Sequence, residues 1–267
     1  QILLQLSKVH NYFNRYLQVG GFPELALADN DILAQQIMRE DVVDKVLKRD
    51  LPSLYKIRNA TELERIFLYL CNVSIEAIAK ELSGVSRPTV ENYIQYLESA
   101  NLIYQSWPVN IGGKKILKAR PKIYIADAAI RNAVLMDDSL LSDPVEMGKI
   151  VETAVYKHVA AFYYQQATSV GYYRGGSHGK EIDIVVEYST ARDILIEVKY
   201  REEAPIPDDA AIVELSGDAA ASIVVTKNAN DFGVHHTKSG KDLIRIPAFA
   251  FLYLLGHAEK HGYRGVE

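Results

Sequence analysis

The stretch EIDIVVEYSTARDILIEVKY, residues 181–200, decides the fold expected for the C-terminal part of this chain. Polar and apolar residues alternate through 181–188 and again through 193–200, and the polar run between them predicts a hairpin loop. On one face this alternation gathers Glu181, Asp183, Val185, Glu187, Leu195, Glu197 and Lys199. The sequence therefore predicts an antiparallel strand pair that carries carboxylates and an amine on one side.

The length of the loop is a test of this arrangement. A five-residue loop, 188–192, pairs Asp183 with Glu197 and brings their Cβ atoms to about 4.5–5.5 Å. A four-residue loop would place them on opposite faces, so the hypothesis requires a loop of odd length or a bulge. Two carboxylates held so close repel each other unless a positive charge lies between them. A hard divalent cation, Mg²⁺ or Mn²⁺, is the natural ligand for such a pair.

We therefore expect a metal-dependent catalytic site. Asp183, Glu197 and Glu152, the last on a helix expected over 148–166, are the predicted metal ligands. Together with Lys199 they are also the predicted catalytic residues. The cation would polarise a scissile phosphate and acidify a bound water, and Lys199 could orient that water or stabilise developing charge. The competing interpretation is an ordinary solvated strand face.

The remaining sequence divides into segments of different character. With 267 residues the chain is long enough for two or three domains, in an α+β or α/β architecture of several parts. Further strands are expected over 169–174 and 221–226, and a last helix over 248–258. The predicted domains are a helical segment (1–60), a winged helix-turn-helix (61–126), a connector (127–147) and the metal-binding domain (148–267).

The winged helix-turn-helix is predicted from its caps and turn. Thr61 and Glu64 form a capping box before an apolar helix, and the tight turn 83–86 separates a short helix, 75–82, from a helix over 87–100. Strands expected within 102–109 and 122–127 would be joined by the wing, 110–122.

This region also supplies the candidate nucleic-acid contacts. In a helix-turn-helix the second helix enters the DNA major groove, and basic residues of the wing neutralise phosphates. The predicted contacts are Arg87, Thr89, Asn92, Lys114, Lys115, Lys118, Arg120 and Lys122. Glu91 and Glu98 disfavour a close approach to DNA, and a role in protein–protein or interdomain contacts is the alternative.

The composition limits the other possibilities. The net charge is −4 and the pI near 6.0, so any contact with nucleic acid must be local. Cys71 is the single cysteine, which excludes an internal disulfide. Without an 18-residue apolar run or a signal peptide, we expect a cytoplasmic protein that does not enter membranes. Gly179-Lys180-Glu181 lacks the Ser or Thr of a P-loop, so we expect no nucleotide-binding site and no cofactor-binding residues of that kind.

The order Glu152, Asp183 and Glu197-Val198-Lys199, on helix, strand and strand, resembles the PD-(D/E)XK (restriction-endonuclease-like) nuclease superfamily. The resemblance covers 148–230 and implies a mixed central sheet flanked by helices, with Mg²⁺ as cofactor. Ile182 stands where the proline of the family motif would be. Some members of this superfamily have lost catalysis and only bind.

A wider resemblance spans nearly the whole chain. Residues 13–17 (FNRYL), 20–23 (GGFP), the winged helix, 121–124 (PKIY), Gly148 with Glu152, and the hairpin are together similar to the C-terminal half of archaeal and bacterial AAA-type ATPases. This implies a P-loop ATPase domain before Gln1 as a partner, with ATP bound only there, and a possible homo-oligomer. The start of the chain at Gln1, inside a helical pattern and without methionine, likewise predicts a piece of a longer protein.

Three functions follow as alternatives. The first is a metal-dependent phosphodiesterase acting on nucleic acid, with DNA as the expected substrate and the winged helix positioning it. The second is a catalytically silent module that binds DNA or a partner and regulates the ATPase. The third is a purely transcriptional regulator, which leaves the carboxylates of the hairpin unexplained.

Overall fold

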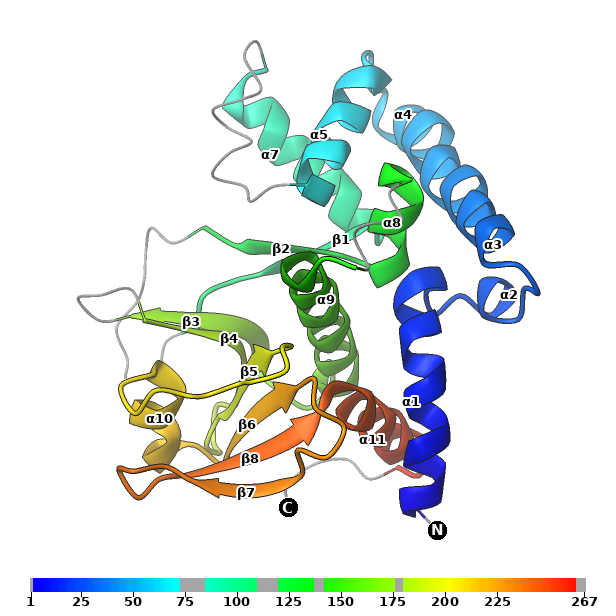
Figure 1. Cartoon of the computed structure of the whole chain (residues 1–267). Coiled ribbons are helices and arrows are strands. Elements are labelled where there is room, and N and C mark those ends of the chain that lie inside the picture. Colours follow the sequence, from blue (N-terminus) through cyan, green and yellow to red (C-terminus); the bar gives the residue numbers. More distant parts are fainter. Residues whose placement is uncertain (1, 73–84, 110–119, 137–141, 176–179, 263–267) are drawn as a thin grey trace. The chain divides into compact units, whose positions relative to one another are not determined.

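The computed structural model describes residues 2–72, 85–109, 120–136, 142–175 and 180–262, with side chains from residue 8 onward (Figure 1). The chain forms two compact units. The sheet unit comprises Gln1–Phe13, Ser106–Pro121 and Pro144–Glu267, and the helical unit comprises Asn14–Gln105 and Lys122–Asp143. Helix α1 (Ile2–Val19) contributes residues to both. None of the helices in the described ranges has the length and apolar character needed to cross a membrane.

The helical unit consists of short helices and one small sheet. Strands β1 (Ile103–Ser106) and β2 (Lys122–Ile125) form a two-stranded sheet. The helical elements are α2 (Pro23–Ala26), α3 (Asp31–Ile37), the π-helical segments η1 (Met38–Asp44) and η2 (Val46–Asp50), α4 (Leu51–Tyr55), α5 (Ala60–Asn72), α7 (Arg87–Ser99) and α8 (Ala128–Leu135).

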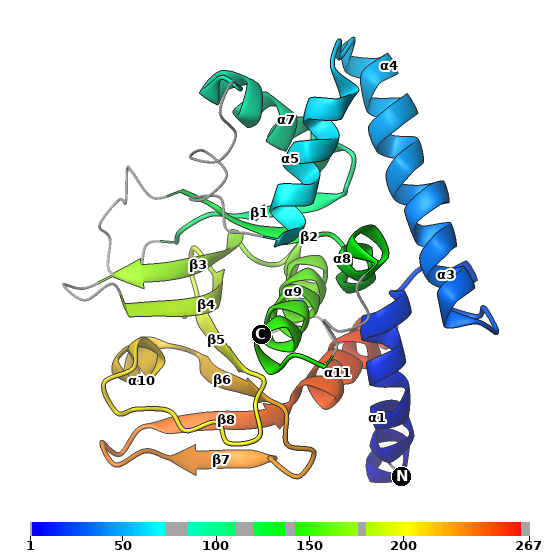
Figure 2. The same ribbon diagram turned by 45° about the horizontal axis from the view of Figure 1, so that its top comes forward.

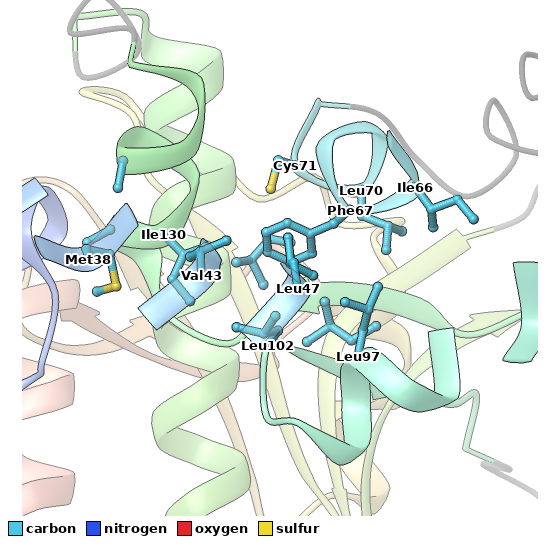
Figure 3. Packing of buried hydrophobic residues seen from close by; sticks show 14 of the residues in the cluster. Met38, Val43, Leu47, Ile66, Phe67, Leu70, Cys71, Leu97, Leu102 and Ile130 are labelled. Atoms are coloured by element: carbon cyan, nitrogen blue, oxygen red, sulfur yellow. The ribbon is translucent and has the colours of Figure 1, made fainter. Parts of the chain in front are cut away.

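A shared hydrophobic core holds the helical unit together. Met38, Val43 and Leu47 pack in the same cluster as Phe67 of α5 and Ile130 of α8 (Figure 3). Burial of each such side chain contributes about 1.5–3 kcal/mol, so this shared cluster stabilises the unit as a whole. Residues on both sides of the predicted boundaries at 60/61 and 126/127 contribute to this core.

The motif residues near the start of the chain have a structural role in this unit. Arg15 donates hydrogen bonds to the carbonyls of Ala26 and Ala28 and to the Asp31 carboxylate. Gly20 has φ +84°, and a Cβ there would lie 2.4 Å from Oδ1 of Asp127. Only glycine fits this left-handed position without strain. These residues therefore fix the chain reversals around α2.

Part of the predicted winged helix can be compared with the structure. Ser86 caps α7 as expected, since its hydroxyl accepts a hydrogen bond from the Thr89 backbone N–H. The order α5, α7, β1, β2 fits the predicted elements. The predicted helix 75–82 and the wing residues Lys114, Lys115 and Lys118 lie outside the described residues.

The sheet unit is a six-stranded mixed sheet with strand order β3-β4-β5-β6-β8-β7. Adjacent strands are antiparallel from β3 to β5, parallel from β5 through β6 to β8, and antiparallel again between β8 and β7. The strands are β3 (Ser169–Gly175), β4 (Lys180–Glu187), β5 (Ile194–Lys199), β6 (Ala221–Thr226), β7 (Gly233–His236) and β8 (Asp242–Pro247). The expected mixed α+β character of this part is confirmed.

Helices cover both faces of this sheet (Figures 1 and 2). Helix α10 (Ala211–Leu215), followed by the 3₁₀ turn η4 (Ser216–Asp218), packs on one face, where Ile212 contacts the cluster containing Leu195 and Val224. Helices α9 (Pro144–Tyr163) and α11 (Ala248–Lys260) lie together on the other face. The sheet centre is therefore dry, and polar side chains there require partners.

Candidate functional site

The hairpin of β4 and β5 has the register that a five-residue loop requires. The backbone pairs are Ile184 with Ile196, Val185 with Leu195 and Val186 with Ile194. One further pair in this register would join Asp183 to Glu197, and the backbone ladder ends at that point. The two acids therefore stand at opposite register positions where the strands begin to separate.

A β-bulge in β4 changes the regular alternation of its side chains. Gly171 of β3 pairs with Val185 but Tyr173 pairs with Ile182, so that Asp183 and Ile184 together oppose the single residue between them, Tyr172. Beyond the bulge Ile182 packs in the same cluster as Val185. The prediction that residues 181–188 alternate without interruption is thus wrong, because the extra residue shifts the phase of the strand.

The bulge directs the Asp183 side chain across the hairpin. Its Oδ2 accepts a hydrogen bond from the backbone N–H of Val198, with 2.9 Å between nitrogen and oxygen. This bond replaces the main-chain pair that the ladder lacks here. It brings the Asp183 carboxylate beside the peptide that joins Glu197 to Val198.

Glu197 is an acid of the sheet unit whose side chain is withdrawn from water. Its side chain is buried, with 8% of the residue exposed, and its Oε2 has no hydrogen-bond partner among the described residues. Burial, followed by the nearby Asp183 carboxylate, raises the pKa of Glu197 to about 7, against the opposing effect of Lys199. A carboxylate in such surroundings is stabilised by protonation or by a cation.

Lys199 supplies one positive charge to this cluster. Its ammonium group forms an ion pair with Oε1 of Glu197 two residues earlier on the strand. Lys199 is half-buried, so water screens the pair only in part. The structure thus brings together Asp183, Glu197 and Lys199, three of the four predicted catalytic residues.

Glu152, the fourth predicted catalytic residue, lies on a helix and not on the hairpin. It is half-buried on α9, the helix that packs on β3, β4 and β5. Among the residues that the structure describes, no three His, Cys, Asp or Glu side chains are grouped so as to hold a metal ion. A site with all three carboxylates as ligands therefore remains a prediction.

The described residues among the predicted nucleic-acid contacts lie on α7 and within the C-terminal part of the predicted wing, 110–122. Arg87 and Asn92 are exposed on α7, where Arg87 forms an ion pair with Glu91. Such exposed pairs contribute little energy and open readily. Arg120 is exposed, and Lys122, which begins β2, is half-buried.

Arg245, a residue that sequence reasoning missed, supports the loop that follows Lys199. Its guanidinium contacts both carboxylate oxygens of Asp231, with a shortest distance of 2.7 Å, and donates to the Ala204 carbonyl at 2.9 Å. Val224 of β6 pairs with both Glu197 and Arg245, so the arginine lies in the same row of the sheet, two strands away. Its position between Ile244 and Ile246 was the available signal, because a charged residue inside an apolar strand run needs partners.

Comparison with known families divides the chain at nearly the same place as the start of α9. Residues 10–141 match one domain of unknown function (DUF8612), and residues 147–249 match another (DUF4143). The second is often found together with AAA-type ATPase domains. The carboxylate–lysine hairpin lies wholly within the DUF4143 match.

Two uncharacterized proteins are similar in sequence. One, from Methanocaldococcus jannaschii, is 24% identical over 261 residues, which cover 92% of this chain and 56% of the relative. The other, from Haemophilus influenzae, is 25% identical over 136 residues, covering 48% of this chain and 34% of the relative. The chain thus spans about half or less of the curated relatives that it matches. No solved structure matches it.

Proposed function

We propose that the sheet unit binds a divalent cation at Asp183 and Glu197 and hydrolyses phosphodiester bonds of a nucleic acid. The observation that carries this proposal is the Glu197 carboxylate, which is buried beside a second acid with one oxygen lacking a hydrogen-bond partner among the described residues. A divalent cation would satisfy that oxygen and remove the repulsion between the two acids.

The available donors fit Mg²⁺ or Mn²⁺. Both ions prefer oxygen ligands, and Mg²⁺ commonly takes one or two carboxylates, with waters and substrate phosphate completing the octahedron. Asp183 and Glu197 would be the protein ligands, and Glu152 would act as a further ligand or hold a metal-bound water. Two direct carboxylates are enough for such a site.

The chain's own residues would divide the remaining work. The bound cation would supply Lewis-acid activation of the phosphate and of a water. Lys199, held at Glu197, would stabilise the negative charge that develops on the phosphate oxygens. Asp183 would keep its orientation through Val198 while it binds the cation. The mixed sheet with helices on both faces agrees with the PD-(D/E)XK resemblance.

The helical unit would bind the nucleic acid as a winged helix. Support comes from the capped helix α7, the strand pair β1–β2 after it, and a basic stretch between these strands. Arg87, Thr89 and Asn92 would face the groove of a DNA duplex, and the wing lysines would contact phosphates. An ATPase domain elsewhere in the full-length protein would be the partner of both units. That domain would also mediate any assembly into a homo-oligomer.

A catalytically silent module is the second candidate. It is favoured by the lack of a three-carboxylate group among the described residues. In that case Asp183, Glu197 and Lys199 would retain a structural or binding role, and the nucleic acid would be held without cleavage.

A cleavage assay with matched variants separates the two candidates. Single- and double-stranded DNA and RNA are incubated with the chain and Mg²⁺ or Mn²⁺. We expect Asp183→Asn and Lys199→Met each to lower the rate at least ~100-fold, as the loss of an electrostatic catalytic group does. Glu181→Gln and Lys180→Met on the same strand are the matched controls and should cleave normally. Binding without cleavage by the unaltered chain would favour the silent module.

A further inference from the structure

The C-terminal helix α11 carries a pair of histidines that the proposed function does not use. His257 and His261 are four residues apart, a spacing that places side chains on the same helix face. Their ring centroids lie 4.3 Å apart with an angle of 37° between the planes. The two imidazoles are therefore already adjacent, one above the other along the helix.

A cavity gives access to this pair. It has a volume of about 410 Å³ and is lined by Leu252, Tyr253, Gly256, His257, Lys260 and His261. Gly256 opens one side of it, because a Cβ at this position would meet no atom within 4 Å. The space is large enough for an ion and several waters.

The chemistry of the lining selects a class of ligand. Two histidines at i and i+4 on one helix face are a recurrent arrangement for metal binding. Neutral imidazole suits Zn²⁺, Cu²⁺ and Ni²⁺, whereas Mg²⁺ and Mn²⁺ prefer oxygen. We propose that His257 and His261 form a two-imidazole site for a late first-row divalent cation, with water completing its coordination.

The position in the helix adds to this preference. α11 ends at Lys260, and His261 is its C-terminal cap. The carbonyl end of a helix carries a partial negative charge that favours cations nearby. Lys260 opposes a cation, but it is exposed, so water and salt screen its charge.

The adjacency of the two imidazoles also determines the expected affinity for the cation. Once one imidazole holds the ion, the second binds it at an effective concentration on the order of millimolar or higher, because the helix keeps the rings adjacent. Loss of either ring should therefore weaken binding at least ~10-fold. The affinity order should follow Cu²⁺ above Ni²⁺ and Zn²⁺.

Electron paramagnetic resonance of added Cu²⁺ tests the site directly, with His257→Gln, His261→Gln and the double variant. We expect nitrogen hyperfine structure from two imidazoles in the unaltered chain, from one in each single variant, and at least ~10-fold weaker binding in each. His235→Gln, which changes an exposed histidine on β7, is the matched control and should leave the signal unchanged.

Circular dichroism of each variant shows whether it is folded, and Asp183→Asn shows whether the site is separate from the proposed Mg²⁺ site. The Cu²⁺ signal should persist in Asp183→Asn. An equal Cu²⁺ affinity and spectrum in the folded double variant would overturn the proposal.

Discussion

Asp183 and Val198 are joined across the β4–β5 hairpin by a side-chain to main-chain hydrogen bond of 2.9 Å. The bond forms where the ladder of main-chain pairs has ended, one residue beyond Ile184 and Ile196. Asp183 thus has a structural role, which is to satisfy the Val198 N–H, and a proposed chemical role, which is to bind a cation. Different substitutions can separate the two.

Replacing Asp183 with asparagine should keep the fold and remove the charge. The amide oxygen of the new side chain can still accept from Val198, so we expect the free energy of unfolding to change by less than about 1 kcal/mol. Replacement with alanine leaves a partly buried N–H unpaired and should cost about 1–3 kcal/mol. Urea unfolding of both variants measures the difference. Equal destabilisation by the two would contradict the assigned hydrogen bond.

The Glu197→Gln variant should be more stable than the unaltered chain at alkaline pH. The pKa of Glu197 is raised from 4.5 to about 7, so the folded state retains a proton that the unfolded chain releases. The resulting stability is fully present below about pH 4.5 and is lost as pH rises through about 7. At about 1.36 kcal/mol for each pKa unit, we expect the free energy of unfolding of Glu197→Gln to exceed that of the unaltered chain by about 3 kcal/mol at alkaline pH. Thermal unfolding without divalent ions at acidic and alkaline pH tests the sign, and a less stable variant at alkaline pH would refute it.

Gly171 should not tolerate a side chain. A Cβ there would lie 2.1 Å from the Trp107 carbonyl oxygen and 2.7 Å from Cγ1 of Val109. Gly171→Ala should therefore destabilise the sheet unit by about 1–3 kcal/mol. Gly148→Ala is the matched control, because a Cβ there meets nothing within 4 Å and alanine favours the α9 helix by about 0.5–1 kcal/mol. Chemical denaturation should show a lower free energy of unfolding for Gly171→Ala and a higher one for Gly148→Ala. An unchanged stability of Gly171→Ala would show that β3 can shift to make room for the methyl group.

Arg245 should resist replacement by lysine. Its guanidinium makes a two-pronged contact with Asp231 and a third bond to Ala204, which a single ammonium group cannot reproduce. We expect Arg245→Lys to cost about 1–3 kcal/mol, and Arg245→Ala about 3–5 kcal/mol because the half-buried Asp231 is left unpaired. Asp231→Asn combined with Arg245→Ala should recover part of the loss. A double variant that merely adds the two losses would mean that the pair is not coupled.

The sequence was most informative where its pattern was local. Alternation and the odd loop length predicted the pairing of β4 with β5, because register in a hairpin follows from loop length. The bulge at Asp183 could not be predicted, since it depends on Tyr172 of the neighbouring strand. Strand β7 was missed because all four of its residues are exposed and show no alternation.

Which segments would share a core was less predictable, for a related reason. Met38 and Leu47 show only that a helix has an apolar face, and they do not show which segment covers it. The structure joins them to Phe67 and Ile130, from segments expected to be separate. Likewise, sequence could place Glu152 on a helix near the hairpin but could not determine the reach of its side chain, which depends on how α9 packs.

Calorimetric titration with Mn²⁺ is the most direct test of metal binding at Asp183 and Glu197, because Mn²⁺ prefers carboxylate oxygen to imidazole. We expect that one ion binds per chain, and that Asp183→Asn weakens this binding at least ~10-fold while His257→Gln does not. Equal Mn²⁺ binding by the unaltered chain and by folded Asp183→Asn, or no binding by either, would contradict a metal site at the β4–β5 hairpin.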